Sequence, residues 1–324
     1  MIPDNFNKIP RIPLAPLYSP IEKMDRLSSV LKGAPNLYIK RDDFLGQLVW
    51  GNKLRKLEYT FAQALSVGCD LIITCGGIQS NHARTTAQIA RRLGLDCILV
   101  MNGSEPIQPA GNFKVLKLMD VKINFVSDSL MRENEMKRLA AEMTAKGKKP
   151  FTIPLGASDI NGIPGFVNAM RELNDQEEDL GITFNYIYHP SSSGGTQAGF
   201  EAGKRLFDRN DITITGISAD SSREELASRI CRICNPFFAK LESDLIIREE
   251  DPDIYTDFIG EGYGIPTQGS ERAKKLFLQN EGILLDDTYT AKAADGLISH
   301  CEQGLFKATD NVLFWHTGGL ISLI

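Results

Sequence analysis

Three short segments of the sequence combine the polar side chains and glycines that a reactive site needs. The first, residues 51–58 (GNKLRKLE), places Lys53, Arg55 and Lys56 within four residues, where a helical pattern begins after a glycine. Cations at a helix start oppose the helix dipole by only roughly a few tenths of a kcal/mol. The segment is therefore also compatible with a solvated basic helix start, and the other two segments must decide its role.

The second segment, residues 75–82 (CGGIQSNH), ends an apolar strand pattern and opens a helical one. Ligands of parallel sheets bind at such strand ends. Ser80 and Asn81 could serve only as helix N-caps, and His82 could be an ordinary residue at a helix end. Two glycines followed by four polar side chains exceed what a cap needs, which makes Gln79, Ser80 and Asn81 candidates for binding a ligand.

The third segment, residues 191–196 (SSSGGT), lies between a strand pattern and a helical pattern. Hydroxyls and exposed backbone N–H groups at a helix N-terminus bind phosphate, and glycine lets the anion approach closely. Ser193, Gly194, Gly195 and Thr196 are the candidate phosphate ligands, although a flexible linker has a similar composition. The segment lacks the lysine of a P-loop and the spacing of a dinucleotide fingerprint, which disfavours nucleoside triphosphates and NAD.

Together the three segments indicate an aldehyde cofactor that carries its own phosphate. A lysine near a glycine offers an amine, a polar loop follows a strand, and a glycine-rich segment offers a phosphate cup. Pyridoxal phosphate meets all three requirements.

Alternation of short apolar strands with amphipathic helices predicts the elements that position these segments. From about residue 70 the pattern is that of a parallel α/β protein. Strands are expected at residues 71–75, 98–101, 121–126, 151–154, 186–189, 212–217 and 312–315, and helices at residues 81–93, 114–119, 130–146 and 196–207. The polar stretch 172–181 is the clearest candidate for a linker.

Length and composition set the broad class. At 324 residues the chain suits two domains or one large α/β unit. A net charge of -5 gives no basic field for nucleic acid or an anionic membrane, and no stretch reaches membrane-spanning length. The N-terminal residues lack a signal-peptide pattern, so a cytoplasmic protein with six reduced cysteines is expected. Cys231 and Cys234 lack a second ligand pair and the four histidines lack metal spacing, so no metal is expected.

Six motifs follow one another over nearly the whole chain. They are residues 51–59 (GNKLRKLEY), 79–82 (QSNH), 193–196 (SGGT), 262–266 (GYGIP), 287–290 (DTYT) and 316–319 (HTGG). In this order they resemble the D-cysteine desulfhydrase and 1-aminocyclopropane-1-carboxylate deaminase family. The resemblance implies the tryptophan synthase β-type fold (type II) of pyridoxal-phosphate enzymes, an α/β fold with two open twisted sheets flanked by helices. A small domain at residues 57–165 would be inserted in a large domain formed by residues 1–56 and 166–324.

The resemblance also implies how the cofactor is held. Lys53 would form the internal aldimine with pyridoxal 5′-phosphate. Asn81 would contact the cofactor's 3-hydroxyl. Lys56 and residues 193–196 would hold the phosphate.

Substrate contacts follow from the same matches. Ser80, with its neighbours Gln79 and Asn81, would lie near the carboxylate of a small amino-acid substrate. Tyr263 and Tyr289 would face the substrate and, with Lys53 and Ser80, form the catalytic set.

Thr290 is the most informative position for the reaction. Family deaminases typically carry glutamate after the preceding tyrosine, which keeps the pyridine nitrogen protonated and makes the ring a strong electron sink. A hydroxyl from Thr290, or from Thr317 nearby in the family fold, would leave that nitrogen unprotonated and favour elimination over cyclopropane ring opening. Lys53 would remove the α-proton, the β-substituent would leave, and hydrolysis would give pyruvate and ammonia.

Two departures from the family pattern leave the substrate open. Trp50 stands where many relatives carry a small residue, and residues 155–159 (LGASD) differ from the commoner form. Trp50 could line the pocket or only pack; if it lines the pocket, L-cysteate or another β-substituted amino acid is a candidate beside D-cysteine. The alternatives are a 1-aminocyclopropane-1-carboxylate deaminase and a non-catalytic amino-acid or cofactor-binding protein. The resemblance further implies a homodimer.

Overall fold

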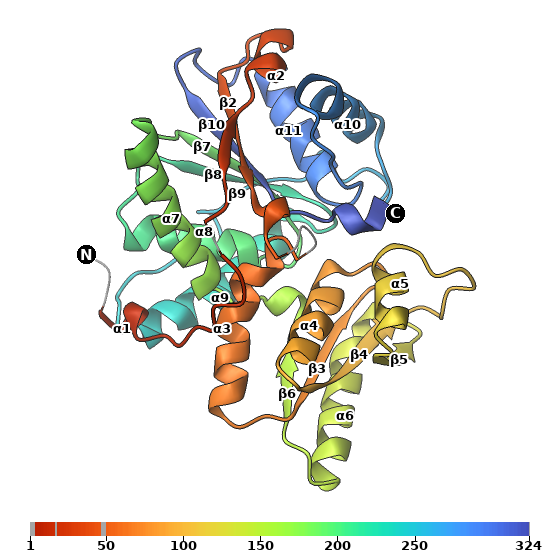
Figure 1. Ribbon diagram of the computed structural model, residues 1–324. Helices are drawn as coiled ribbons and strands as arrows, with labels where there is room; N and C mark the ends of the chain where they lie inside the picture. Colours follow the sequence, from red (N-terminus) through yellow and green to blue (C-terminus); the bar gives the residue numbers. More distant parts are fainter. Residues whose placement is uncertain (1–3, 17, 47–49, 324) are drawn as a thin grey trace.

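Two sheets organise the chain, and the computed structural model describes residues 4–16, 18–46 and 50–323 of it (Figure 1). The larger sheet has the strand order β1-β2-β10-β7-β8-β9, and the smaller one has the order β5-β4-β3-β6. β1 pairs antiparallel with β2, and the other strand pairs described are parallel. The strands are β1 (Ile21–Lys23), β2 (Asn36–Arg41), β3 (Leu71–Gly76), β4 (Asp96–Asn102), β5 (Lys122–Val126), β6 (Pro150–Ile153), β7 (Tyr186–Ser191), β8 (Thr213–Ser218), β9 (Asp253–Tyr255) and β10 (Asn311–His316).

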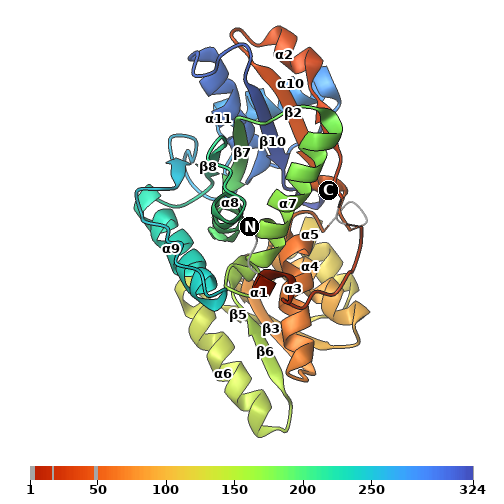
Figure 2. The same cartoon turned by 90° about the vertical axis from the view of Figure 1, so that its left-hand side faces the viewer.

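Helices cover the faces of both sheets (Figures 1 and 2). They are α1 (Asp4–Asn7), α2 (Asp25–Val30), α3 (Lys53–Ser66), α4 (Asn81–Arg92), α5 (Gly111–Leu118), α6 (Arg132–Ala145), α7 (Pro164–Leu180), α8 (Gly195–Leu206), α9 (Arg223–Lys240), α10 (Gln268–Glu281) and α11 (Thr290–Glu302). Short 3-10 turns occur at Asp42–Phe44, Ser129–Met131, Leu155–Ala157 and Leu320–Leu323. No helix in the described part of the chain is both long and apolar enough to cross a membrane.

The packing of the smaller sheet explains why its strands appear in the sequence as short apolar runs. Successive side chains of a strand point to opposite faces, and here helices cover both faces. Ile73 of β3 packs against Leu139 of α6, whereas its neighbour Ile72 packs in a cluster with Phe61 of α3 and Ile89 of α4. All five side chains are buried, so this strand must be apolar along most of its length.

The central strand of the larger sheet follows the same rule. Val312 and Phe314 of β10 pack in a cluster with α10 and α11, and Leu313 and Trp315 pack in another with α7 and α8. Each of these four side chains is fully buried. Burial on both faces explains the uninterrupted apolar run that identified this strand in the sequence.

The prediction of a linker at residues 172–181 is wrong. Residues 172–180 form the second half of α7, and two of their polar side chains point inward instead of toward solvent: Glu172 and Gln176 are both buried. The structure also shows α3 and α7 crossing the expected domain limits at 56/57 and 165/166. The exact division into domains stays a prediction.

A buried ionic network ties α7 to the start of α3 and to β2. Arg55 of α3 donates to both carboxylate oxygens of Asp42 at 2.8 and 2.7 Å, and to Glu172 of α7 at 2.7 Å. Lys40 of β2 donates to the same Glu172 carboxylate at 2.6 Å. Burial acts against ionisation of Asp42, but Arg55 outweighs it and lowers the pKa of this carboxyl group. The network therefore fixes the first turn of α3 against the larger sheet.

We expect Glu172→Gln to lower the free energy of unfolding by about 3–5 kcal/mol, because it leaves Lys40 and Arg55 short of buried negative charge. Denaturant unfolding of the purified protein measures this change. Glu142→Gln is the matched control, since Glu142 makes only exposed pairs with Arg138 and Lys146 and should cost about 1 kcal/mol or less. Equal losses in the two variants would contradict the proposed role of the network.

Candidate active site

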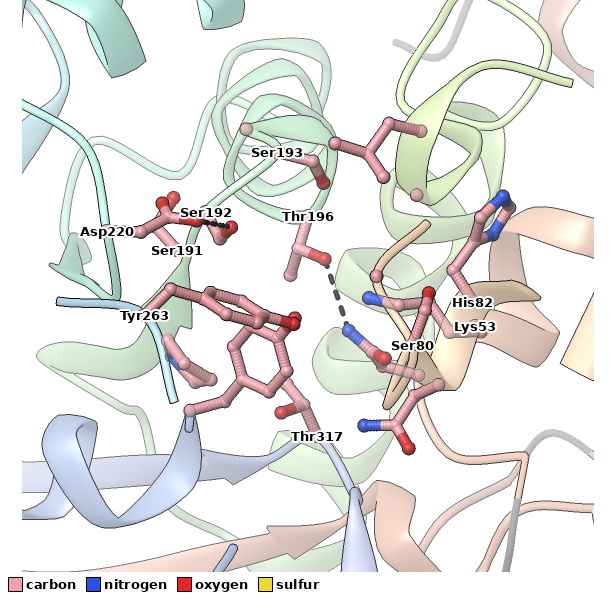
Figure 3. A pocket seen from close by; sticks show the side chains of 18 of the residues that line it. Lys53, Ser80, His82, Ser191, Ser192, Ser193, Thr196, Asp220, Tyr263 and Thr317 are labelled. Atoms are coloured by element: carbon pink, nitrogen blue, oxygen red, sulfur yellow. Dashed lines mark hydrogen bonds between the residues drawn. The ribbon is translucent and has the colours of Figure 1, made fainter. Parts of the chain in front are cut away.

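A cavity of about 350 Å³ opens where strand ends of the two sheets meet. Its wall is formed by the start of α3, the loops that follow β3 and β7, and the residues just after β10. Figure 3 shows Lys53, Ser80 and His82 on one side of the cavity and Asp220 and Tyr263 on the other. The carboxyl ends of parallel strands are where α/β proteins bind ligands, so this cavity is the candidate active site.

Lys53, the first residue of α3, brings its amine to the cavity wall. Burial lowers the pKa of Lys53 to about 8, and the charge of Asp286 opposes that shift only in part. No hydrogen bond or ion pair to this amine occurs among the described residues. An amine with this pKa is substantially neutral near pH 8 and can act as a nucleophile or a base.

Lys56 lies one turn further along α3 and is fully buried. Its Nζ donates to Ser158 Oγ at 3.2 Å. Burial and the neighbouring charge of Lys53 hold the pKa of Lys56 well below its usual value. Neither lysine has a carboxylate within ion-pair distance among the described residues, so an anionic ligand would supply the counter-charge that lets these amines stay protonated. The solvated-helix interpretation of residues 51–58 is therefore wrong.

The segment between β7 and α8 forms the cup that the sequence indicated. Gly194 has a φ of 80° and directly precedes α8, whose N-terminus faces the cavity. Ser158 Oγ, the acceptor of Lys56, lies 2.7 Å from Ser193 Oγ. A Cβ at Gly195 would lie 2.4 Å from Ser158 Oγ, so no larger residue fits there. Backbone N–H groups, hydroxyls and a cation thus converge on one point, as phosphate binding requires.

Two further groups border the same cup. Thr196 Oγ1 accepts a hydrogen bond from the Asn52 amide at 3.3 Å, which links the cup to the start of α3. The Ser191 hydroxyl is buried and has no hydrogen-bond partner among the described residues. A buried hydroxyl without a partner is rare in proteins and is satisfied here if a ligand fills the cavity.

The loop after β3 presents Ser80 and Asn81 to the cavity. Ser80 caps α4 by accepting a hydrogen bond from Ala83 N at 3.1 Å, so the cap role and the cavity position coincide. Asn81 Oδ1 accepts a hydrogen bond from Asn112 Nδ2 at 2.9 Å, which orients the other end of the Asn81 amide. Both side chains lie at the N-terminus of α4, a place that favours a carboxylate or phenolate ligand.

His82 is buried beside the lysines instead of lying at the surface. Burial and the charges of Lys53 and Lys56 hold the pKa of His82 well below its usual value, so the ring is neutral. Thr74 Oγ1 donates its proton to Ile153 O at 2.8 Å and must accept from His82 Nε2, which lies 2.8 Å away. His82 is therefore the Nε2–H tautomer and adds no charge to the site.

Tyr263 and Tyr289 meet on the opposite wall. Their hydroxyls lie 2.5 Å apart, and their rings pack edge to face with centroids 5.7 Å apart. Burial raises the pKa of both phenols, that of Tyr289 well above its usual value. Lys292 of α11 donates to the carbonyls of Ile259 and Gly262 at 2.6 and 2.7 Å and so holds the loop that carries Tyr263. Both phenols are protonated at neutral pH, and since one hydroxyl donates to the other, the pair has one proton left to donate to a ligand.

Of the two threonines expected near a ring nitrogen, Thr317 lines the cavity and Thr290 does not. The Thr290 hydroxyl donates to Asp286 Oδ1 at 2.7 Å and accepts from Asp286 N at 2.8 Å. Its only proton is therefore used within the turn that begins α11. The geometry favours Thr317 as the hydroxyl that a ligand in the cavity would meet.

Trp50 and Gln79 also lie outside the cavity lining, contrary to the expectation that they contact substrate. Trp50 is buried in the core cluster of α3 and donates from its ring nitrogen to Gln88 Oε1 at 3.0 Å. Gln79 turns away toward α5, where its Oε1 accepts from Asn112 N at 2.9 Å. Trp50 thus has the packing role that the sequence left open, and Gln79 orients the segment beside Asn81.

Comparison with known proteins identifies the fold and the cofactor. Residues 12–318 match the model of a family described as pyridoxal-phosphate dependent enzyme. The chain belongs to this family. A solved structure of an ACC deaminase homologue is 34% identical, covers 100% of this chain and 97% of that chain, and has a TM-score of 0.90. The expected type II fold is confirmed, and the cofactor of this enzyme is pyridoxal 5′-phosphate.

More distant structures share the fold alone. Maize serine racemase is 16% identical, covers 98% of this chain and 93% of its own, and has a TM-score of 0.69. A fungal L-serine ammonia-lyase from Rhizomucor miehei is 16% identical, covers 94% of this chain and 94% of its own, and has a TM-score of 0.66.

The residues of the cavity fit pyridoxal phosphate. Lys53 supplies the amine that the aldehyde of the cofactor needs, with its pKa lowered to about 8 by burial. The Lys56 amine, which has no carboxylate partner among the described residues, and the N-terminus of α8 suit a phosphate dianion. The unpartnered Ser191 hydroxyl lines the same cavity. These observations come from the protein alone and agree with the family.

Sequence reasoning missed several residues of the site, four of which matter most here. Asn52, Asp220 and Arg132 line the cavity, and Ser158 joins Lys56 to Ser193. Ser158 and Asn52 lie inside segments that the sequence motifs already marked, so the sequence could have identified both as site residues. Asp220 and Arg132 lie in segments without a motif, and only the packing of the two sheets brings them to the cavity.

The low pKa of Lys53 can be measured by amine labelling of the cofactor-free protein. Because acylating reagents attack the neutral amine, we expect the labelling rate of Lys53 to rise with a midpoint near pH 8. Lys148, whose pKa is raised by its hydrogen bond to Asp96, is the internal control and should label only at higher pH. Peptide mass spectrometry follows both sites in one sample, and coincident pH profiles would refute the desolvated state of Lys53.

Proposed function

We propose that this enzyme is a β-eliminating lyase that acts on a small β-substituted amino acid and releases pyruvate, ammonia and the β-substituent. A D-cysteine desulfhydrase activity, with sulfide as the leaving group, and an L-cysteate sulfo-lyase activity are the two forms considered. The observation that carries the proposal is the desolvated Lys53 amine, free of partners in the described chain, which shares one small cavity with the Tyr263–Tyr289 pair. A base and a proton donor are what an elimination needs.

Each group of the site has a part in this proposal. Lys53 takes the α-proton of the substrate, since its low pKa makes the amine available as a base near neutral pH. Ser80 and the N-terminus of α4 bind the substrate carboxylate. Tyr263 and Tyr289 face the substrate from the other wall and supply a proton there. Bound pyridoxal phosphate supplies an electron sink for the negative charge left on the α-carbon.

The cofactor itself would be held by residues of both halves. Lys56 and residues 193–196 would bind its phosphate, and Asn81 would lie at its 3-hydroxyl. Thr317 would face the ring nitrogen in place of Thr290. The positions of the side chains around the cavity support this arrangement.

A 1-aminocyclopropane-1-carboxylate deaminase is the second candidate, because the 34% identical structure is that of an ACC deaminase homologue. Ring opening calls for a carboxylate that keeps the ring nitrogen protonated. Asp220 is the single carboxylate among the described residues that line the cavity, and it accepts a hydrogen bond from Ser192 on the wall away from Thr317. A hydroxyl at Thr317 supports elimination instead.

A cytoplasmic location and a homodimer are further parts of the proposal.

A substrate panel tests the proposal. We expect the holoenzyme to release pyruvate from D-cysteine, L-cysteate or β-chloro-D-alanine, together with sulfide, sulfite or chloride. 2-Oxobutyrate from 1-aminocyclopropane-1-carboxylate, with no pyruvate from the other three, would replace the proposal by the deaminase activity.

Lys53→Ala should abolish turnover of every substrate in the panel, because no other described lysine lies in the cavity lining. Its fold should persist, since the Lys53 amine makes no bond to the described protein. Turnover and the far-ultraviolet circular dichroism spectrum are the two measurements. Lys148→Ala, at an exposed lysine far along the sequence, is the control. Unchanged turnover in Lys53→Ala would refute its role as the base.

A further inference from the structure

Arg132 is a cation in the cavity wall, and the proposed function above assigns it no role. It is the first residue of α6 and lines the cavity together with Asn102 and Ser129. Its Nε donates to the carbonyl of Ser129 at 2.9 Å, and its Nη1 donates to Asn102 Oδ1 at 3.3 Å. These two bonds orient the guanidinium group and leave Nη2 without an acceptor among the described residues.

Among the described residues, the charge of Arg132 makes no ion pair that would stabilise the fold. Lys137 and Arg138 of the same helix pair with Glu133 and Glu135, each at 2.7 Å, whereas no ion pair of Arg132 occurs in the described part of the chain. A cation in the first turn of a helix opposes the helix dipole, so this charge does not stabilise α6. An oriented, half-buried guanidinium group facing a cavity is suited to a ligand with a planar or tetrahedral oxyanion.

Arg132 reaches the cavity from α6, a different element from the N-terminus of α4, to which the proposed function assigns the α-carboxylate. The two places are neighbours, because Asn102 Oδ1, which accepts a hydrogen bond from Arg132, would lie 4.0 Å from a Cβ at Gly77, in the loop that leads to Ser80. A substrate whose carboxylate lies at the start of α4 can therefore bring its β-substituent to Arg132.

Asp220 also favours an anionic group on the Arg132 side of the cavity. Its two carboxylate oxygens accept hydrogen bonds from Ser192 Oγ at 2.8 Å and Ser221 Oγ at 2.9 Å, on the side of the cavity that carries Tyr263. An anionic substituent is repelled from Asp220 and attracted to Arg132. Apart from the phosphate cup before α8 and the N-terminus of α4, the two charges favour an anion on the Arg132 side of the cavity.

We propose that Arg132 determines specificity for substrates whose β-substituent is anionic, with a sulfonate as the best-fitting class. The inference rests on the proposed elimination. For cysteate the Cβ–S bond breaks and its electron pair leaves with sulfur, the α-proton goes to Lys53, and water supplies the carbonyl oxygen. The products from one cysteate and one water are pyruvate, ammonium and hydrogen sulfite. Arg132 binds the sulfonate before the bond breaks and the sulfite anion after it.

The test compares charged and neutral β-substituents in one assay. The holoenzyme, Arg132→Gln and the control Arg138→Gln are each given both enantiomers of cysteate and of β-chloroalanine. Loss of hydrogen bonds to a charged group should lower the ratio of kcat/KM for cysteate over chloroalanine by about 10–100-fold in Arg132→Gln, with partial rescue in Arg132→Lys. Arg138→Gln should keep the ratio. An equal loss for both substrates, or an unchanged ratio, would overturn the proposal.

A binding measurement separates this inference from the proposed reaction. 3-Sulfopropanoate has a carboxylate and a sulfonate but no amine, and butanoate is its neutral-tailed counterpart. Titration calorimetry with the holoenzyme should show tighter binding of 3-sulfopropanoate, lost in Arg132→Gln and kept in Arg138→Gln. This result would support the anion site even if no substrate of the panel released pyruvate. Equal affinity of the wild-type enzyme for the two compounds would refute the site whatever the reaction is.

Discussion

The site depends on which of the three cations in the first turn of α3 are paired with carboxylates. Arg55 is neutralised inside the protein by Asp42 and Glu172, whereas the partly buried Lys53 and the fully buried Lys56 have no carboxylate partner among the described residues. The paired cation fixes the helix, and burial lowers the pKa of the two unpaired amines, which can carry a full charge beside an anionic ligand. The bound cofactor completes the electrostatics of this turn as well as the chemistry of the site.

The other elements of the fold supply what those two lysines need. Parallel strands of both sheets end at the same place, so the loops after β3, β7 and β10 all reach the cavity. The cup before α8 presents hydrogen-bond donors beside Lys56, and the neutral His82 adds no further positive charge. On the far wall, Lys292 and Asp286 hold the segments of Tyr263 and Tyr289, so the two phenols face Lys53 across the cavity.

Much of this arrangement could be predicted from the sequence, because its determinants are local. The apolar runs of β3 and β10 are continuous since helices cover both faces, and the glycines before α8 mark a turn that only such residues allow. Several inferences failed or shifted where one contact decided. Residues 172–180 are part of a partly buried helix because Lys40 and Arg55 neutralise Glu172, and Trp50 and Gln79 found hydrogen-bond partners in Gln88 and Asn112. The hydroxyl of Thr290 is used by Asp286, a local contact within the turn that begins α11.

We propose different parts for the two unpaired lysines, with Lys53 reacting with the cofactor and Lys56 binding its phosphate. Borohydride reduction of the holoenzyme, followed by proteolysis and mass spectrometry, tests that assignment directly, since reduction fixes the cofactor to the lysine with which it has reacted. We expect the added phosphopyridoxyl mass on Lys53, in the peptide that includes residues 51–53, with Lys56 unmodified. A label on Lys56, or on a lysine outside the cavity, would contradict the account.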